Sequence, residues 1–267
     1  MLKRASAKDM GFEMLTPGNA FKQGLAQQRQ MAGFWVSLCS PASAEILALS
    51  GADWLLLDME HAPNEVASIA DQLRAVGSAC PVVVRPPEAN RAVAKRLLDV
   101  GVRSLMFPMI DTPEQAREAV AWTRYPPHGV RGISGVVRAT GYGRNADGYL
   151  ARQHDDICVI VQAETPTALA NIEAIAAVEG VDAIFIGPGD LAAAMGFAGK
   201  GGVPEVRQAI RDGLGRIRAA GCGAGALGYG VEPAKSLFEQ GATFVAVGAD
   251  TWILARESTG LIEGIKQ

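Results

Sequence analysis

The chain has 267 residues, of which 49% are hydrophobic and 20% are charged, and its formal net charge is −3. A chain of this length and apolar content can bury a sizeable core, which favours one large α/β domain over two small ones. No run of Lys or Arg offers a basic surface, so we expect no nucleic-acid partner. The N-terminus lacks the apolar stretch of a signal peptide and no apolar run is long enough to cross a bilayer, so we expect no membrane partner and no export.

The four cysteines are far apart in the sequence. Three of them lie inside apolar, strand-like runs, which is typical of small reduced hydrophobic residues and not of a disulfide framework or a zinc site. The residues are Cys39, Cys80, Cys158 and Cys222. Free thiols of this kind indicate a reducing compartment, the cytoplasm.

Eight short apolar runs follow one another along the chain, and each predicts a strand. They cover residues 33–38, 54–60, 81–86, 104–110, 157–164, 182–188, 222–227 and 244–250. Amphipathic stretches with helical spacing separate them, among them residues 42–51, 65–77, 89–101, 112–124, 167–180 and 205–221. Strands that are apolar throughout and alternate with helices predict βαβ units around a parallel sheet buried on both faces.

Eight such units predict an α/β fold, a (β/α)8 TIM barrel formed by residues 1–267 as one domain. The alternative is an open doubly wound sheet, which is disfavoured because no Gly-x-Gly-x-x-Gly follows the first predicted strand. Residues 1–23 are read as an N-terminal extension and helix. The stretch "TPGNAFKQGLAQQRQ", residues 16–30, is expected to form the helix that closes the bottom of the barrel.

Polar residues gather where the predicted strands end, which is where a TIM barrel carries its active site. They are Asp58, Glu60 and His61 after the second strand, Arg85 after the third, Gln162 and Glu164 at the fifth, and Asp190 in the "GPGD" loop after the sixth. Any one of them could have a purely structural role, as Asp190 could by capping a helix. Their convergence on one mouth favours a site.

The residue types at this mouth suit enolate chemistry. Glu164 and Asp190 are two hard oxygen ligands for Mg²⁺ or Mn²⁺, and leave coordination positions for water and a 2-keto acid. A keto acid that chelates such a metal acquires an acidic C3 proton, and the metal and Arg85 stabilise the enolate. Backbone N–H groups of "GPGD" can seat a carboxylate, and His61, oriented by Asp58, supplies acid–base capacity near neutral pH.

Longer segments carry a resemblance to a known family. They include "GADWLLLDMEHAPNE", "VVVRPP", "KRLLDVGVRSLMFPMIDTPEQAREAV", "RYPPHGVRGISG", "VQAETPTAL", "VDAIFIGPGDLAAAMG" and "GATFVAVGADTWILAR". Across about residues 24–260 the chain resembles the class II pyruvate-dependent hydroxy-keto-acid aldolases of the HpcH/HpaI aldolase/citrate lyase family. This family includes the 4-hydroxy-2-oxoheptanedioate, 2-dehydro-3-deoxyglucarate and 2-keto-3-deoxy-L-rhamnonate aldolases. The resemblance implies a carbon–carbon lyase that reversibly cleaves a 4-hydroxy-2-keto acid to pyruvate and an aldehyde through a metal-bound pyruvate enolate.

The resemblance also assigns roles to individual residues. It implies that Glu164 and Asp190 hold Mg²⁺ or Mn²⁺, with Co²⁺ possible, and that Arg85 polarises the keto oxygen while Gln162 lines the pyruvate pocket. The backbone N–H groups of Gly189 and Asp190 would hold the pyruvate carboxylate. Asp58 and His61 would act with a metal-bound water on the aldehyde-side oxygen, as base in cleavage and as acid in addition.

The same resemblance implies a homohexamer, a dimer of trimers in which the C-terminal helix, about residues 250–267, swaps between subunits. Asp99 would reach a neighbouring active site, Trp35 would line the site, and Ile133 and Leu227 would shape its aldehyde end. Two purely structural interpretations stay open: Asp99 as an ordinary surface residue, and Trp35 as an aromatic residue of the core.

Two segments depart from the family pattern, "RATGYGRNADGYLARQ" at 138–153 and "GALGYGVEP" at 225–233. Both are expected on the aldehyde side, so the acceptor is left open. A lysine-dependent aldolase is disfavoured because no predicted strand carries Lys. A citryl- or malyl-CoA-type lyase shares the fold, but it is disfavoured because nothing in the sequence suggests a CoA-binding site. Oxaloacetate decarboxylation, expected as a side activity, and a non-catalytic keto-acid binder remain the alternatives.

Overall fold

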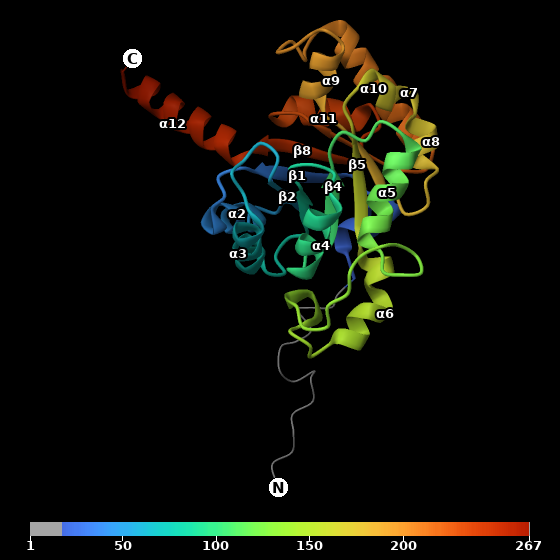
Figure 1. Ribbon diagram of the computed structural model, residues 1–267. Helices are drawn as coiled ribbons and strands as arrows, with labels where there is room; N and C mark the ends of the chain where they lie inside the picture. The colour runs from blue at the N-terminus through green and yellow to red at the C-terminus, as the bar shows by residue number, and fades with distance from the viewer. Residues whose placement is uncertain (1–17, 267) are drawn as a thin grey trace.

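The computed structural model describes residues 18–266, and its centre is a closed barrel of eight parallel strands (Figure 1). The strands are β1 (Met31–Val36), β2 (Trp54–Asp58), β3 (Val82–Arg85), β4 (Ser104–Phe107), β5 (Cys158–Ala163), β6 (Ala183–Ile186), β7 (Gly223–Leu227) and β8 (Phe244–Ala249). Each strand pairs with its neighbours in the sequence, and β1 closes the ring on β8. The predicted TIM barrel is therefore confirmed, and the open sheet is excluded.

Each predicted strand overlaps an observed one, and the first is displaced most. It was predicted at 33–38, whereas β1 begins at Met31, which pairs with Phe244 of β8. β1 stops at Val36 because the next two N–H groups, of Ser37 and Leu38, donate to the carboxylate of Asp250 instead of to a strand. The same bonds tie the loop after β1 to the start of the last helix.

Helices connect the strands on the outside of the barrel. They are α2 (Pro41–Ala48), α3 (Val66–Val76), α4 (Arg91–Asp99), α5 (Pro113–Thr123), α6 (Ala146–Asp156), α7 (Pro166–Ala170), α8 (Ile172–Ala176), α9 (Pro188–Ala194), α10 (Pro204–Ala219) and α11 (Val231–Glu239). Their starts follow from local chemistry. At α5, the Thr112 hydroxyl accepts from the Gln115 N–H, the Gln115 side chain accepts from the Thr112 N–H, and Pro113 takes the first helical position.

Two helical segments differ from the sequence-based prediction. The stretch 167–180 forms α7 and α8 instead of one helix, and the break falls at Asn171, whose side-chain amide donates to the Asp111 carbonyl at 2.8 Å. α6 arises inside the Gly-rich segment 138–153, which shows only a weak helical pattern. Its residue Tyr149 accepts a hydrogen bond from Arg131, so a tertiary contact supports this helix.

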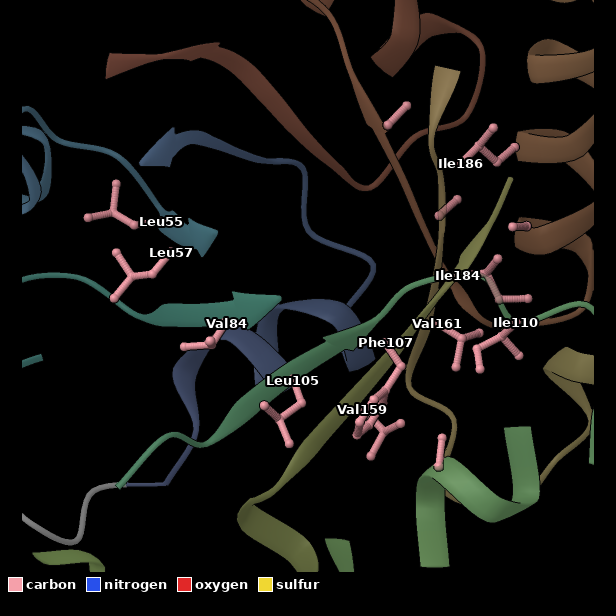
Figure 2. Close-up of a cluster of buried hydrophobic side chains, with 14 of the residues drawn as sticks. Leu55, Leu57, Val84, Leu105, Phe107, Ile110, Val159, Val161, Ile184 and Ile186 are labelled. Atoms are coloured by element: carbon pink, nitrogen blue, oxygen red, sulfur yellow. The ribbon is translucent and has the colours of Figure 1, made fainter. Parts of the chain in front are cut away.

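The strands bury both faces, which is why they read as continuous apolar runs. In β2, Trp54 and Leu56 point into the barrel, whereas Leu55 and Leu57 pack outward against the helices. Figure 2 shows part of the outer layer, where Leu55 and Leu57 lie near residues of neighbouring strands.

Helix α1 (Ala20–Ala26) covers the amino-terminal end of the barrel. Phe21 is fully buried and its ring lies 5.6 Å from that of Trp54 and 5.4 Å from that of Phe244. Asn19, which caps α1, donates to the carbonyls of Arg103 and Asp156 just before β4 and β5. Large apolar side chains therefore close this end of the barrel, and the polar residues predicted to form the site lie at the opposite end, at the carboxyl ends of the strands.

The last helix, α12 (Asp250–Lys266), projects away from the barrel (Figure 1). Asp250 is its one buried residue within the described part of the chain, and apolar side chains lie exposed along it, namely Leu254, Leu261, Ile262 and Ile265. None of the helices within residues 18–266 combines the length and apolar character that a bilayer span requires.

Candidate active site

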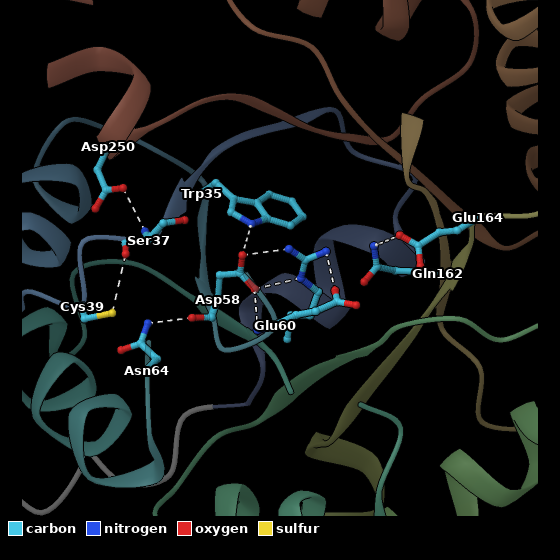
Figure 3. A network of polar contacts seen from close by, with 10 residues as sticks. Trp35, Ser37, Cys39, Asp58, Glu60, Asn64, Gln162, Glu164 and Asp250 are labelled. Atoms are coloured by element: carbon cyan, nitrogen blue, oxygen red, sulfur yellow. Dashed lines mark hydrogen bonds and ion pairs between the residues drawn. The ribbon is translucent and has the colours of Figure 1, made fainter. Parts of the chain in front are cut away.

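Five polar side chains meet at the carboxyl ends of β2, β3 and β5, and we call them the polar arc (Figure 3). They are Asp58, Glu60, Arg85, Gln162 and Glu164. Four of the five are at least 95% buried, and Glu60 is half-buried. Ionisable groups buried to this degree persist only where partners hold them, so the contacts of the arc determine what it can do.

Arg85 is fixed by three charged or aromatic neighbours. Its Nε and Nη2 donate to the two carboxylate oxygens of Asp58 at 2.9 and 2.8 Å, and Nη1 lies 2.8 Å from a carboxylate oxygen of Glu60. The guanidinium also lies over the Trp35 ring, 4.9 Å from its centroid. An arginine has five N–H donors, so three contacts leave two N–H groups for a ligand.

Asp58 is the partner of Arg85 in the structure. Its carboxylate also accepts from the Trp35 indole N–H at 3.1 Å and from the Glu60 backbone N–H at 3.0 Å. Burial alone would raise the pKa of Asp58, but the hydrogen bonds and charge of Arg85 outweigh it and lower this pKa. His61 follows at the exposed rim of the loop, and no hydrogen bond between it and Asp58 occurs among the contacts of residues 18–266. The predicted Asp58–His61 pairing stays a prediction.

Glu164 lies deeper in the mouth, where it follows β5. One carboxylate oxygen accepts from the Gln162 side-chain amide at 2.8 Å, and the other accepts from the Met109 N–H at 3.1 Å. Gly187 at the end of β6 makes room for it, because a Cβ there would lie 2.3 Å from a carboxylate oxygen of Glu164. Burial, reinforced by the charges of Glu60 and Asp190, raises the pKa of Glu164 to about 7.

Gly189 and Asp190 form the exposed first turn of α9, where the sequence predicted a loop. The first backbone bond of this turn runs from the Leu191 N–H to the Gly187 carbonyl, so the N–H groups of Gly189 and Asp190 have no acceptor within the helix. Asp190 is near enough for its charge to raise the pKa values of both Glu60 and Glu164, in each case after burial.

The charge balance of this mouth fits a divalent cation. The carboxylates of Asp58, Glu60 and Glu164 act on the guanidinium of Arg85, and the carboxylate of Asp190 acts on Glu60 and Glu164. The side-chain oxygen of Gln162 is buried without a hydrogen-bond partner. Within residues 18–266 no three His, Cys, Asp or Glu side chains are arranged to hold a metal. Glu164 and Asp190 are the two carboxylates that could hold a hard cation here, with water and substrate oxygens as its other ligands.

Comparison with known proteins identifies the family of this chain. Residues 31–256 match the family described as HpcH/HpaI aldolase/citrate lyase. The chain belongs to this family. It is 50% identical to the hydroxypyruvate/pyruvate aldolase of Deinococcus radiodurans, over 93% of this chain and 90% of the relative. It is 46% identical to the 4-hydroxy-2-oxovalerate aldolase of Rhodococcus jostii, over 93% of this chain and 96% of the relative.

A solved structure of an HpcH/HpaI family protein from Burkholderia cenocepacia superposes with a TM-score of 0.90 at 39% identity, covering 93% of this chain and 100% of that one. The predictions of this family and of a carbon–carbon lyase of the aldolase type are therefore confirmed. The described strands of this HpcH/HpaI protein contain no lysine, which matches the argument against a lysine-dependent aldolase.

The remaining predicted site residues of this HpcH/HpaI chain divide into two groups. Trp35 and Leu227 lie at the mouth and pack with the inner core. Asp99 ends α4, and its carboxylate accepts from Arg131 at 2.9 Å. Ile133 is 67% exposed in the connection after α5, beside the exposed face of α4. The structure gives Asp99 and Ile133 no contact with the polar arc of their own barrel within residues 18–266.

Sequence reasoning missed three contributors to the mouth. Glu60 was noted at a strand end but received no role, although it binds Arg85. Met109 donates a backbone N–H to Glu164 from a loop in which its φ is 55°. No sequence pattern predicts this backbone conformation. Tyr229 lies between two glycines after β7. A single aromatic residue in such a loop was the sequence feature that could have indicated a place at the mouth.

Proposed function

We propose that this HpcH/HpaI protein is a divalent-metal-dependent aldolase that interconverts a 4-hydroxy-2-keto acid with pyruvate and an aldehyde. One observation carries the proposal. A guanidinium locked in place by Asp58 and Glu60 lies in the same mouth as two further carboxylates, Glu164 and Asp190, which form no ion pair within residues 18–266. The names of the two relatives support a 2-keto acid as substrate and pyruvate as donor.

Glu164 and Asp190 are the residues that would hold the cation, with Mg²⁺ or Mn²⁺ as the expected ion and Co²⁺ as a further candidate. When bound, the cation supplies the positive charge that makes the C3 hydrogen of a 2-keto acid acidic. The carboxylate pair is suited to this task because Glu164 is oriented by Gln162 and the Met109 N–H before any ligand arrives.

The remaining residues bind and orient the keto acid. Arg85 directs its two uncommitted N–H groups at the keto oxygen, where negative charge develops when the C3–C4 bond breaks in cleavage or when water takes the C3 proton of pyruvate in exchange and addition. The N–H groups of Gly189 and Asp190 hold the carboxylate. Because Asp58, Glu60 and Trp35 already fix the guanidinium, little reorganisation is needed as the charge forms.

His61 moves the proton on the aldehyde side. It is the histidine nearest in sequence to the polar arc and lies at its exposed rim. In cleavage it takes the proton of the C4 hydroxyl, and in addition it returns this proton to the aldehyde oxygen. Asp58 contributes by holding Arg85 and, as the family resemblance implies, by acting with His61.

We also propose a homohexamer, a dimer of trimers that acts in the cytoplasm. α12 carries exposed apolar side chains and projects from the barrel, which fits a helix that packs on a second copy. Asp99 and Ile133, away from the mouth of their own barrel, would then serve a neighbouring subunit. The four cysteines are free, as a reducing compartment requires. Light scattering after size exclusion tests the assembly, and a monomeric mass at micromolar concentration would contradict it.

The experiment that tests the activity is proton exchange at the pyruvate methyl group in D₂O, followed by NMR with Mg²⁺ or Mn²⁺ and again with excess EDTA. It reports enolate formation without any aldehyde. We expect exchange that disappears with EDTA and returns when the cation is restored. Exchange that persists in EDTA would indicate a lysine mechanism, and no exchange in any condition would favour the keto-acid binder.

A further inference from the structure

The mouth of the barrel has two chemically different sides. β2, β3, β5 and α9 carry the polar arc and Asp190. The side formed by β7 and β8 carries Leu227, Tyr229 and Trp252, which we call the aromatic arc. Leu227 and Trp252 pack on the core inside the barrel, so this arc continues the inner apolar layer up to the mouth.

The contacts of the loop after β7 place Tyr229 at the mouth. In β7, Gly225 and Leu227 face the barrel interior, because a Cβ on Gly225 would meet Phe244 and Leu227 packs with the inner core. Gly228 faces outward, since a Cβ there would lie 2.9 Å from the Leu237 side chain of α11. β7 ends at Leu227, and the Gly228 and Gly230 N–H groups donate to the β8 carbonyls of Ala246 and Val247, which hold the following loop against β8. The Tyr229 ring lies 5.3 Å from that of Trp252, which packs on the inner core, so Tyr229 lies on the mouth side of this loop.

Tyr229 faces the polar arc from the opposite side of the barrel. β7 lies four strands from β3 in the eight-stranded ring, so Tyr229 and Arg85 stand across the mouth. Burial raises the pKa of Tyr229, and Arg85 and Asp58 are the two charged groups that act on it. The side chain is nevertheless 45% exposed, so a ligand can reach it.

Trp252 makes this side rigid. Its ring lies 5.3 Å from that of Tyr229 at an interplanar angle of 47°. The Arg256 guanidinium lies over the Trp252 ring, 5.0 Å from the ring centroid. Trp252 follows Asp250, which accepts from the Ser37 and Leu38 N–H groups and from the Ser43 hydroxyl. The first turn of α12 is thus anchored to the loop after β1, and the two rings form a preformed aromatic wall.

We propose that Tyr229, held against Trp252, binds the acceptor aldehyde and favours aldehydes with a flat apolar substituent. This inference rests on the proposed aldolase function. The donor keto acid belongs on the polar arc, where the carboxylates and Arg85 lie, so the aldehyde must approach from the remaining side. An aryl group on the aldehyde packs on the two rings, whereas a small hydroxylated aldehyde gains little from them.

The test compares kcat/KM for benzaldehyde and for glycolaldehyde, with pyruvate as donor, in the wild type, Tyr229→Ala and Tyr229→Phe. Tyr229→Ala should lower the benzaldehyde to glycolaldehyde ratio about tenfold, because the aromatic contact is lost. Tyr229→Phe keeps the ring and should keep the ratio. Tyr142→Ala changes another exposed tyrosine and is the matched control. Its segment was expected on the aldehyde side, but the structure places Tyr142 beside Arg74 in the last turn of α3, away from the mouth, so the ratio should also be kept.

Pyruvate methyl exchange separates the possible failures. Tyr229→Ala should exchange at the wild-type rate, because the polar arc is intact. An unchanged ratio, or a loss of exchange together with aldol turnover, would overturn the acceptor role. Absence of exchange in the wild type would instead overturn the aldolase function, and this inference with it.

Discussion

The polar arc and the aromatic arc share one mouth but are held in different ways. The side chains of the polar arc are buried, apart from half-buried Glu60, and are fixed by hydrogen bonds and ion pairs, as Arg85 is by Asp58 and Glu60. Tyr229 is half-exposed and is held by ring contact with Trp252. Charges must stand at fixed points to stabilise an enolate, whereas an apolar wall tolerates many shapes. The contrast predicts that substitutions in the polar arc abolish enolate formation, whereas substitutions in the aromatic arc change which aldehyde the enzyme prefers.

The largest effect is expected for Glu164→Ala. Removing a proposed metal ligand should reduce metal-dependent pyruvate exchange on the order of 10³-fold or more, as for loss of the electrostatic stabilisation of an oxyanion. The fold should survive, because the carboxylate is buried among like charges and its pKa is already raised. Exchange by NMR and thermal unfolding measure the two quantities. Glu173→Gln, which alters an exposed ion pair with Arg216, is the control. Lower stability with turnover retained would identify Glu164 as structural.

His61→Ala should give the next largest effect. It should affect proton transfer on the aldehyde side and not the binding of pyruvate. Loss of a general acid–base residue typically costs about 10²–10⁴-fold, so aldol cleavage should slow by this order while pyruvate binding changes little. Steady-state kinetics and the KM for pyruvate measure both. His154→Ala, in α6, is the matched control. An unchanged aldol rate would refute the acid–base role and leave the polar arc without a proton carrier for the aldehyde oxygen.

Arg85→Lys tests whether the geometry of the polar arc matters beyond its charge. Lysine keeps the charge but cannot engage both oxygens of Asp58 and still reach Glu60 and the keto oxygen. We expect kcat/KM to fall by about 10²–10³-fold, comparable to loss of one oxyanion donor. The aldehyde preference should stay constant, because the aromatic arc is untouched. Arg117→Lys, in an exposed pair with Glu114, is the control. Near wild-type activity would show that a point charge suffices.

The two arcs also differ in how far the sequence predicts them. Asp58, Arg85 and Glu164 are visible in the sequence because each lies at or directly after the end of a buried strand whose length and apolar character fix that end. The Asp58–Arg85 pairing is not visible, since it depends on the register that sets these two residues side by side in β2 and β3. The position of Tyr229 cannot be predicted from the sequence, for a further reason. Its place at the mouth depends on a ring contact with Trp252 of α12, and no periodicity in the glycine-rich loop after β7 records that contact.

The smallest effect is expected for Trp35→Phe, at the boundary between the arcs. The indole N–H donates to Asp58, and its ring lies under Arg85 and 5.5 Å from the ring of Phe185. Phenylalanine keeps the ring but removes one hydrogen bond to a carboxylate that retains Arg85, a loss of about 1 kcal/mol or roughly fivefold in kcat/KM. Exchange and aldol rates should fall together, with Trp122→Phe in the outer layer as control. A changed aldehyde ratio would place Trp35 in the aromatic arc, whereas equal falls in both rates place it with Arg85, because the donor chemistry is common to both assays.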